Sequence, residues 1–308
     1  MADVSTKLRG ELRVDEPMSR HVSWRAGGAA RRFFKPADLE DLIAFLPTIA
    51  RDEPILFVGL GSNLLVRDGG FAGTIVLTTP SIHGLSLDAA DKAIVRAGAG
   101  VASPHVAKFA AKHDLVGAEW LAGVPGTVGG ALAMNAGCYG NETWEQVVDC
   151  QTIDRNGDIR TRTAKDYEIG YRHVAPREAQ RSAFSVHEEW FICARFRFTP
   201  GDAAAAQAKI KELLARRMAS QPLDKPNAGS TFRNPPGDHA ARLIESCGLK
   251  GYTIGGAQVS IKHANFIINT GTASAADIES LIDHLQATVK HRTGIELVRE
   301  VRIVGEAA

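Results

Sequence analysis

Two glycine-rich stretches carry the clearest chemical signal in this chain. The first is Gly59-Leu-Gly-Ser-Asn-Leu-Leu65, and the second is Gly123-Val-Pro-Gly-Thr-Val-Gly-Gly-Ala-Leu-Ala-Met-Asn-Ala-Gly137. Because glycine lacks a Cβ atom, backbone amides at such turns can approach an anion closely. We therefore expect the two stretches to form two halves of one phosphate-binding floor for a large phosphorylated cofactor.

The first stretch does not match the dinucleotide-binding pattern G-x-G-x-x-G, which opens a helix directly after a strand. Gly59 and Gly61 fit this pattern, but Leu64 occupies the third glycine position and Leu64–Val66 reads as a continuing strand. Ser62 and Asn63 are expected to cap phosphate or backbone groups. Taken alone, this stretch could also be an ordinary tight turn.

Three polar side chains are candidates for proton transfer or for binding charge. Ser230 lies in Ala-Gly-Ser-Thr-Phe-Arg-Asn-Pro, residues 228–235, which predicts an exposed loop of fixed shape. No G-x-S-x-G elbow surrounds it, so a proton donor or a plain turn residue fits better than a nucleophile. Arg172, in Gly-Tyr-Arg-His, could grip a carboxylate with two parallel hydrogen bonds, or could be a surface arginine at a strand edge.

Glu300 is the third candidate. It interrupts a predicted strand over 295–304, in which it shares a face with Val298. A carboxylate on a buried face is costly unless it is paired or functional, whereas on a solvated face it needs no explanation.

Composition restricts the class of protein. The 308 residues are 44% hydrophobic and 23% charged, with a net charge of +1, as in a soluble globular protein with no general attraction to nucleic acid. Met1–Gly10 is polar and no apolar run is long enough for a membrane helix, so we expect a cytoplasmic protein. The four cysteines (Cys138, Cys150, Cys193 and Cys247) and the ten histidines are scattered, which predicts no metal and no disulfide framework.

Periodicity and capping residues predict a mixed order of elements. A capping serine, Ser103, is expected to open one helix, and Ser274 with Asp277 forms a capping box for another. A boundary between domains is expected around 200–222. Helices are predicted over 38–49, 103–113, 202–219, 238–247 and 274–294, and strands over 54–58, 64–66, 74–77, 93–96, 150–154, 159–163, 189–198, 252–259, 266–269 and 295–304.

The ordered motifs resemble those of the UDP-N-acetylenolpyruvoylglucosamine reductase family over roughly residues 18–305. The resemblance rests on both glycine stretches, Tyr171-Arg172, the 228–235 segment, Ile254–Ser260, Lys262–Asn269 and Glu300–Gly305. The Tyr-Arg region lacks an insertion found in some members, which indicates the compact subtype.

The resemblance implies an α+β fold. A two-part FAD-binding domain of the vanillyl-alcohol oxidase/p-cresol methylhydroxylase type would be joined to a smaller α/β substrate-binding domain. The corresponding ranges are 1–80 and 81–200 for the two parts of the FAD-binding domain and 201–308 for the substrate-binding domain, with a strand at 296–308 able to return to the first part.

The resemblance also implies a reaction, the reduction of UDP-N-acetylglucosamine enolpyruvate to UDP-N-acetylmuramate for peptidoglycan. Hydride would pass from NADPH to N5 of non-covalent FAD and then to the enolpyruvyl β-carbon. Ser230 would protonate the α-carbon, while Arg172 and Glu300 would stabilise the enolate-like charge. The expected partners are these small molecules alone, and the protein is expected to be a monomer.

Further positions match family contacts. Two departures are Arg233, where relatives commonly have lysine, and Cys138, where alanine is frequent. The residues matched to the flavin are Gly59, Gly61, Ser62, Asn63, Leu64, Gly126, Thr127, Gly129, Gly130, Asn135 and Gly137, and those matched to the substrate are Tyr171, Asn234, His263, Tyr139 and Arg233.

Two other classes of function remain open from the sequence. A flavin-dependent oxidase of the same fold would share the cofactor motifs, although no tethering motif surrounds His105. A non-catalytic nucleotide-binding or sensing protein would explain the glycine stretches but not Ser230, Arg172 and Glu300.

Overall fold

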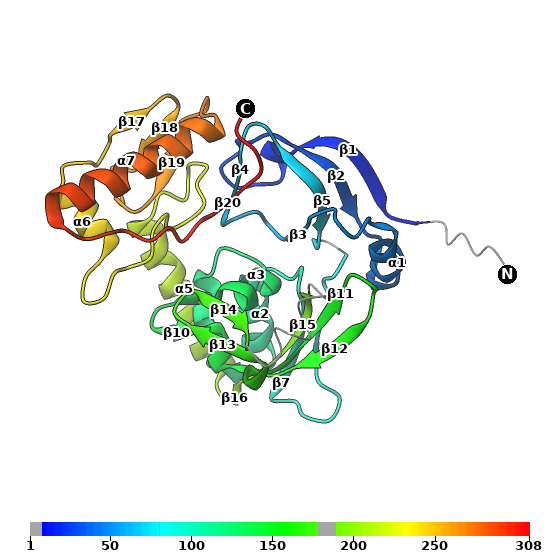
Figure 1. The fold of residues 1–308 in the computed structure, drawn as a ribbon. Helices are drawn as coiled ribbons and strands as arrows, with labels where there is room; N and C mark the ends of the chain where they lie inside the picture. The colour runs from blue at the N-terminus through cyan, green and yellow to red at the C-terminus, as the bar shows by residue number, and fades with distance from the viewer. Residues whose placement is uncertain (1–7, 80, 178–188) are drawn as a thin grey trace. The chain divides into compact units, whose positions relative to one another are not determined.

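The computed structural model describes residues 8–79, 81–177 and 189–308, and the chain forms two compact units (Figure 1). The first unit comprises the chain up to Arg13 together with Phe33–Gly59 and Thr74–Leu214. The second unit comprises Val14–Arg32, Leu60–Gly73 and Ala215–Ala308. The division into three parts expected from the sequence stays a prediction.

A four-stranded sheet has the order β1-β2-β5-β3, formed by β1 (Glu11–Pro17), β2 (Ala29–Lys35), β5 (Phe71–Leu77) and β3 (Ile55–Val58). Helix α1 (Leu39–Phe45) begins where the Asp38 side chain accepts a hydrogen bond from the amide of Asp41, and a 3-10 turn (Leu46–Thr48) extends it. This confirms the predicted helix and strand that precede Gly59.

A five-stranded antiparallel sheet with the order β12-β11-β15-β7-β6 dominates the first unit. Alternate apolar residues on one face pack with α2 and α3 into a common core that includes Val95, Phe196 and Leu132. The predicted hairpin is confirmed, with Asn156-Gly157 in its turn. The elements are β6 (Leu85–Leu87), β7 (Ile94–Gly98), α2 (Ser103–Lys112), α3 (Val128–Met134), β11 (Val147–Asp154), β12 (Ile159–Arg162) and β15 (Glu189–Arg197).

Ser103 does not cap α2, contrary to the prediction. Ala102 is the N-cap because it is held in an antiparallel bridge to Thr127, so the helix starts at Ser103 itself. The Ser103 hydroxyl is buried and has no hydrogen-bond partner among the residues that the structure describes. The second glycine stretch is also more than a loop, since α3 occupies its centre.

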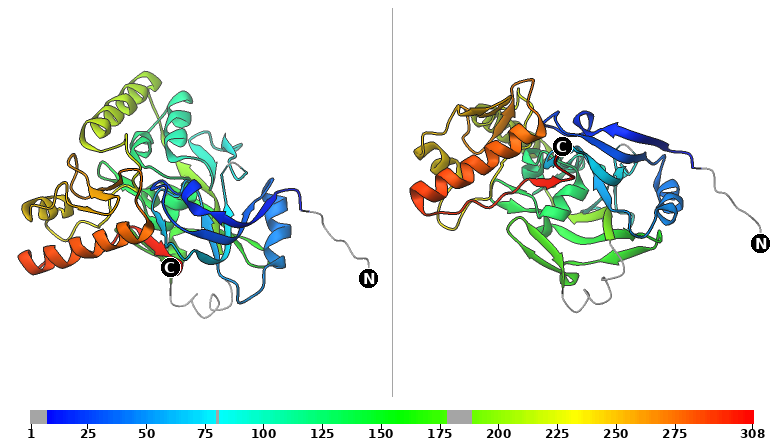
Figure 2. Two further views of the ribbon diagram at one scale, coloured as in Figure 1. Left: turned by 90° about the horizontal axis from the view of Figure 1, so that it is seen from above. Right: turned by 45° about the horizontal axis from the view of Figure 1, so that its top comes forward.

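The second unit is built on α7 (Ala275–Thr293), orange to red in Figures 1 and 2, which packs on a sheet of the order β17-β18-β19. The predicted capping box is confirmed, and Gly294 ends α7 in the left-handed conformation at φ +74°. The strand predicted at 64–66 is also confirmed, and it pairs in parallel with β20. The elements are β4 (Leu64–Val66), α6 (Ala240–Ser246), β17 (Thr253–Ile254), β18 (Ala257–Val259), β19 (Ile267–Asn269) and β20 (Arg302–Val304).

Two predicted strands of this unit are wrong in extent. Residues 252–259 form a hairpin because Gly255 turns the chain at φ +52°. Only Arg302–Val304 of the predicted 295–304 strand is regular. Leu297 and Val301 are buried whereas Val298 is 55% exposed, so the buried face of this segment is not the one that Glu300 was expected to share with Val298.

The remaining elements are short, apart from one long helix. Helix α5 (Ala203–Ser220) confirms the alanine-rich helix predicted at 202–219. Among the described residues, no helix combines the length and apolar character needed to span a membrane. The short strands are β8 (Leu115–Val116), β9 (Gly137–Cys138), β10 (Asn141–Glu142), β13 (Tyr167–Gly170), β14 (His173–Pro176) and β16 (Thr199–Pro200).

Candidate active site

The candidate site residues fall into both units, and each group is held by its own set of contacts. The first unit holds Gly59, the second glycine stretch, Tyr139, Tyr171 and Arg172, whereas the second unit holds residues 61–64, Ser230, Arg233, Asn234, His263 and Glu300.

The segment that carries Ser230 is fixed by backbone hydrogen bonds on both sides. The amide of Thr231 donates to the carbonyl of Asn265 (2.8 Å), and the carbonyl of Thr231 accepts from the amide of Glu300 (2.8 Å). Ser230 is half-buried, while Thr231 and Phe232 are fully buried. The expectation of a fixed shape is confirmed, but the segment is not an exposed loop, because Phe232 anchors it in the core.

Asn63 links the first glycine stretch to the backbone segment around Glu300. Its side-chain amide donates to the carbonyl of Glu300 (3.1 Å), and its own carbonyl accepts from the amide of Arg302 (3.0 Å). Thus Asn63, Glu300 and the segment of Ser230 form one hydrogen-bonded ladder, although they are far apart in the sequence.

Three predicted substrate contacts lie near this ladder. The amide of Arg233 donates to the carbonyl of Val298 (2.8 Å), and the side-chain Nε of Arg233 is buried with no hydrogen-bond partner in the described part of the chain. The Asn234 side-chain oxygen accepts from the amide of Ala240 (3.1 Å) at the start of α6. Burial lowers the pKa of His263, so its imidazole is neutral at pH 7 and can act as donor or acceptor.

Arg172 lies in the turn between β13 and β14, where Gly170 and His173 pair. The backbone of Arg172 is left-handed (φ +54°), and its guanidinium donates to the carbonyls of Asn135 (3.3 Å) and Gly137 (2.9 Å). Tyr171, 46% exposed, lies beside it, with the guanidinium carbon 5.0 Å from the ring centre. The guanidinium is therefore held in place by the protein, unlike that of a mobile surface arginine.

Asn135 and Tyr139 are engaged within the protein. The Asn135 amide nitrogen donates to Glu142 Oε2 (2.7 Å) and to the carbonyl of Gly170 (3.1 Å). The Tyr139 hydroxyl donates to the carbonyl of Leu213 (2.7 Å). Their predicted contacts with flavin and substrate stay predictions, and any such contact would use other atoms of these residues.

The glycines show where a cofactor could fit. A Cβ on Gly59 would lie 2.3 Å from Thr127 Oγ1, so the first stretch approaches the second stretch closely here. A Cβ on Gly130, an exposed residue in the first turn of α3, would have only Thr127 Oγ1 nearby, at 4.0 Å. The amide of Gly129 donates to the carbonyl of Ala99 (2.9 Å). Gly130 therefore leaves room for a cofactor beside α3, while the amide of Gly129 is already engaged within the protein.

Asn265, for which no role was predicted, organises the ladder. This buried side chain accepts from the amide of Phe232 (3.0 Å) and donates to the carbonyl of the same residue (2.8 Å). The sequence did contain a signal for this role: Asn265 is a polar residue in an otherwise apolar run after His263, and a buried side-chain amide needs hydrogen-bond partners.

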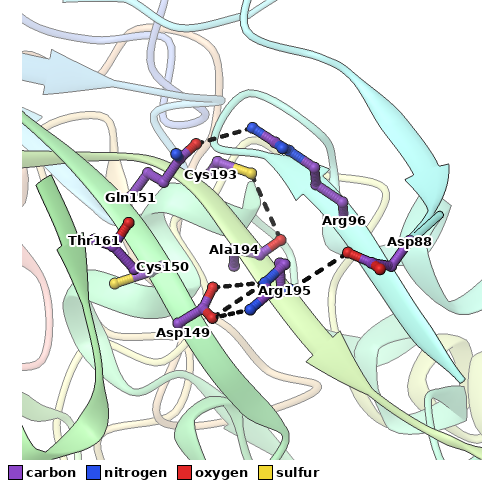
Figure 3. Close-up of a pocket in the computed structure, with 9 residues that line it drawn as sticks. All are labelled: Asp88, Arg96, Asp149, Cys150, Gln151, Thr161, Cys193, Ala194 and Arg195. Atoms are coloured by element: carbon purple, nitrogen blue, oxygen red, sulfur yellow. Dashed lines mark hydrogen bonds and ion pairs between the residues drawn. The ribbon is translucent and has the colours of Figure 1, made fainter. Parts of the chain in front are cut away.

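A groove of about 220 Å³ on the five-stranded sheet was also not predicted (Figure 3). Its residues come from β7, β11, β12 and β15 and from the turn after β6. In Figure 3, Arg195 lies between Asp149 and Asp88, and Arg96 donates to Gln151 Oε1 (2.9 Å).

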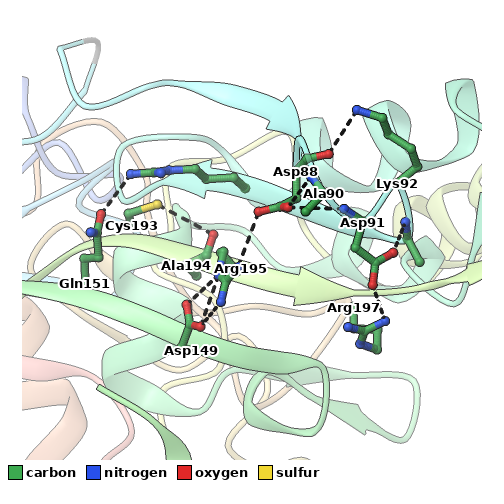
Figure 4. A network of polar contacts seen from close by, with 12 residues as sticks. Asp88, Ala90, Asp91, Lys92, Asp149, Gln151, Cys193, Ala194, Arg195 and Arg197 are labelled. Atoms are coloured by element: carbon green, nitrogen blue, oxygen red, sulfur yellow. Dashed lines mark hydrogen bonds and ion pairs between the residues drawn. The ribbon is translucent and has the colours of Figure 1, made fainter. Parts of the chain in front are cut away.

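The charges in this groove are largely compensated by their neighbours. Hydrogen bonds from Arg195 to Asp149 raise the pKa of the arginine, and the network continues to the Asp91–Arg197 pair (Figure 4). Burial raises the pKa of the Cys150 thiol to about 12, so this sulfur is not a thiolate at pH 7. We therefore interpret the charged residues of this groove as an ion-pair network that stabilises the sheet.

Comparisons with known proteins agree on one family across the two units. Residues 30–162 match the model of an FAD binding domain. Residues 221–304 match the model of the UDP-N-acetylenolpyruvoylglucosamine reductase C-terminal domain. The structure is similar to the crystal structure of UDP-N-acetylenolpyruvylglucosamine reductase from Thermus caldophilus, with a TM-score of 0.75, 27% identity, and 96% of this chain and 98% of that chain covered.

Two curated relatives are similar over almost their full length, and both are named UDP-N-acetylenolpyruvoylglucosamine reductase. The protein of Thiobacillus denitrificans is 57% identical, with 97% of this chain and 94% of the relative covered. The protein of Nitrosospira multiformis is 55% identical, with 98% and 90% covered.

Proposed function

Because the chain belongs to the UDP-N-acetylenolpyruvoylglucosamine reductase family of FAD-dependent oxidoreductases, we propose that it reduces UDP-N-acetylglucosamine enolpyruvate with NADPH. The product is UDP-N-acetylmuramate, a precursor of peptidoglycan. The observation that carries the proposal is the ladder of Asn63, Glu300 and the Ser230 segment, since it joins a cofactor-binding stretch to two candidate catalytic residues.

FAD, when bound, supplies a two-electron carrier that accepts hydride from NADPH and delivers hydride to the β-carbon of the enolpyruvyl group. The glycine stretches would hold it through backbone groups and short side chains. The residues proposed for this role are Gly59, Gly61, Ser62, Asn63, Leu64, Gly126, Thr127, Gly129, Gly130 and Gly137.

Ser230 donates the proton that the α-carbon needs. A serine hydroxyl is a weak acid, so this transfer depends on the hydroxyl being held at the reacting carbon before the proton moves. The hydrogen bonds that fix Thr231 on both sides supply that rigidity.

Arg172 and Glu300 bind the carboxylate of the enolpyruvyl group, on which negative charge grows during the reduction. The guanidinium supplies fixed positive charge. An ionised Glu300 would repel the growing charge, so the proposed role requires a proton between Glu300 and the substrate carboxylate.

Tyr171, Asn234, His263, Tyr139 and Arg233 are proposed to line the rest of the substrate site. The buried Nε of Arg233 supports this assignment, because an unpartnered buried donor is costly until a ligand accepts from it. Because both substrates are water-soluble nucleotides, we place the reaction in the cytoplasm. We also propose that the enzyme is a monomer.

The flavin spectrum tests the proposal. Purified protein should be yellow, and NADPH should bleach it in the absence of oxygen. Adding UDP-N-acetylglucosamine enolpyruvate should then restore the colour in stopped-flow absorbance. Restoration by oxygen alone at a comparable rate would indicate a flavin oxidase, and a protein that gains no flavin on reconstitution would contradict the proposal altogether.

A further inference from the structure

We propose that Asn135 is a positioning residue that holds the hairpin turn of Arg172, so that the guanidinium meets the substrate carboxylate in one orientation. This inference rests on the proposed function of Arg172. It gives the Asn135 side chain a role toward the arginine in place of a contact with the flavin.

The side chain of Asn135 is fully committed to the protein. It is 2% exposed, and its two amide hydrogens go to Glu142 Oε2 and to the carbonyl of Gly170. Its oxygen accepts from the amide of Trp144 (3.1 Å). A side-chain amide has two donor hydrogens, so none is left for a cofactor.

Asn135 contacts the turn of Arg172 at two points. The side chain binds the carbonyl of Gly170, two residues before the arginine, and the backbone carbonyl accepts from the guanidinium (3.3 Å). The carbonyl of Gly137 accepts from the same guanidinium (2.9 Å). The turn and the side chain of Arg172 are therefore fixed by one short segment at the end of α3.

The turn of Arg172 has an uncommon backbone conformation. Arg172 has φ +54°, in the left-handed region that few residues other than glycine, asparagine and aspartate adopt, whereas Asn135, at φ +43°, is the left-handed C-cap of α3, a position that suits asparagine. A left-handed arginine persists only where surrounding contacts over-determine it, and such conformations concentrate at functional sites. The hydrogen bonds of Asn135 are contacts of this kind.

Glu142 sets the orientation of the Asn135 amide. Its carboxylate also accepts from the amide of Glu145 in a reciprocal capping box, so it is anchored on its own side. If the Asn135 amide were flipped, its oxygen would lie 2.7 Å from Glu142 Oε2, and two acceptor oxygens at that distance repel each other. A series of hydrogen bonds thus runs from Glu142 through Asn135 to Gly170 and supports the turn that carries the arginine.

The variant Asn135→Gly tests the inference, because glycine adopts φ +43° without strain while all side-chain hydrogen bonds are lost. We expect kcat/KM for the enolpyruvyl substrate to fall about 10-fold. FAD affinity, measured by flavin fluorescence, and flavin reduction by NADPH should stay within about 2-fold of wild type. Asn141→Ala is the matched control, since its side chain makes one long bond to the Tyr139 carbonyl (3.3 Å), and it should leave all three values unchanged.

A double-mutant cycle separates positioning from a general loss of structure. In the Arg172→Ala background, Asn135→Gly should cost less than about 2-fold, because the arginine through which it acts is gone. Glu142→Gln keeps an oxygen acceptor and should retain more activity than Glu142→Ala. Equal losses in both backgrounds, or a fall in FAD affinity as large as the fall in kcat/KM, would overturn the inference.

Thermal unfolding distinguishes this inference from the proposed function. If the wild type binds FAD but does not use the enolpyruvyl substrate, the proposed function fails. The cycle can then be read in melting temperatures, where Asn135→Gly and Arg172→Ala should be coupled. Additive changes in melting temperature would show that the two residues do not support each other, and the inference would fail on its own.

Discussion

Gly59→Ala tests whether the two glycine stretches must touch for the cofactor to bind. The added Cβ would lie 2.3 Å from Thr127 Oγ1, 2.8 Å from Cγ2 and 3.1 Å from Cβ, all closer than ordinary van der Waals contact. Thr127 is 3% exposed and cannot swing into solvent. The backbone must move instead, and such overpacking costs about 1–3 kcal/mol.

If that cost falls on the FAD-bound form, the dissociation constant for FAD rises by about 5- to 150-fold. The assay is titration of apoprotein with FAD, followed by flavin fluorescence, together with the melting temperature of the apoprotein. Gly84→Ala is the matched control, because its Cβ would meet no atom within 4 Å.

A rescue variant makes the reasoning specific. In Gly59→Ala/Thr127→Ala the contacts at 2.3 and 2.8 Å disappear and, of the three nearest atoms, the one at 3.1 Å remains, so part of the affinity should return relative to Thr127→Ala alone. Wild-type FAD affinity together with a wild-type melting temperature in Gly59→Ala, or no recovery of either value in the double variant, would refute the close approach of the two stretches.

Three further outcomes follow from single positions. Ser230→Ala should still be reduced by NADPH, but recolouring by the enolpyruvyl substrate should slow about 10²- to 10⁴-fold in stopped flow, and wild-type turnover would exclude the serine as the acid. Burial by itself would raise the pKa of Asp154, but hydrogen bonds from Arg160 and from backbone amides lower it overall. Its contribution to stability is therefore present above an unfolded-state pKa of about 3.9 and is lost as pH falls through the lower folded-state value. The difference in melting temperature between wild type and Asp154→Asn should shrink below about pH 4, and a constant difference would contradict this. Ser274→Ala should lower stability by about 1 kcal/mol in thermal unfolding and leave kinetic constants unchanged, because it removes only a helix cap.

Features fixed by a few neighbouring residues could be predicted from the sequence. Ser274, Asp277 and Gly294 mark both ends of α7, and the structure places all three as expected. The Asn156-Gly157 turn likewise fixed the register of its hairpin. In each case the decisive contacts lie within a few residues, so local geometry decides the outcome.

Features that depend on distant partners were predicted wrongly or not at all. Ser103 looked like a helix cap, but the bridge from Ala102 to Thr127 shifts the start of α2. The alternation around Glu300 suggested a long strand, but the segment pairs only locally: the amide of Glu300 donates to the carbonyl of Thr231, and the amide of Arg233 donates to the carbonyl of Val298.

Motif order and residue chemistry can be read along the chain, so the amino-acid sequence was enough to identify the family, to propose two cofactor-binding stretches and to select Ser230, Arg172 and Glu300 as candidates. How each candidate is held could be seen only in the folded molecule. Asn265 fixes the serine segment, and Asn135 fixes the arginine turn. These supports are hydrogen bonds to backbone groups across 33 to 37 residues, and such pairing depends on how the intervening chain folds.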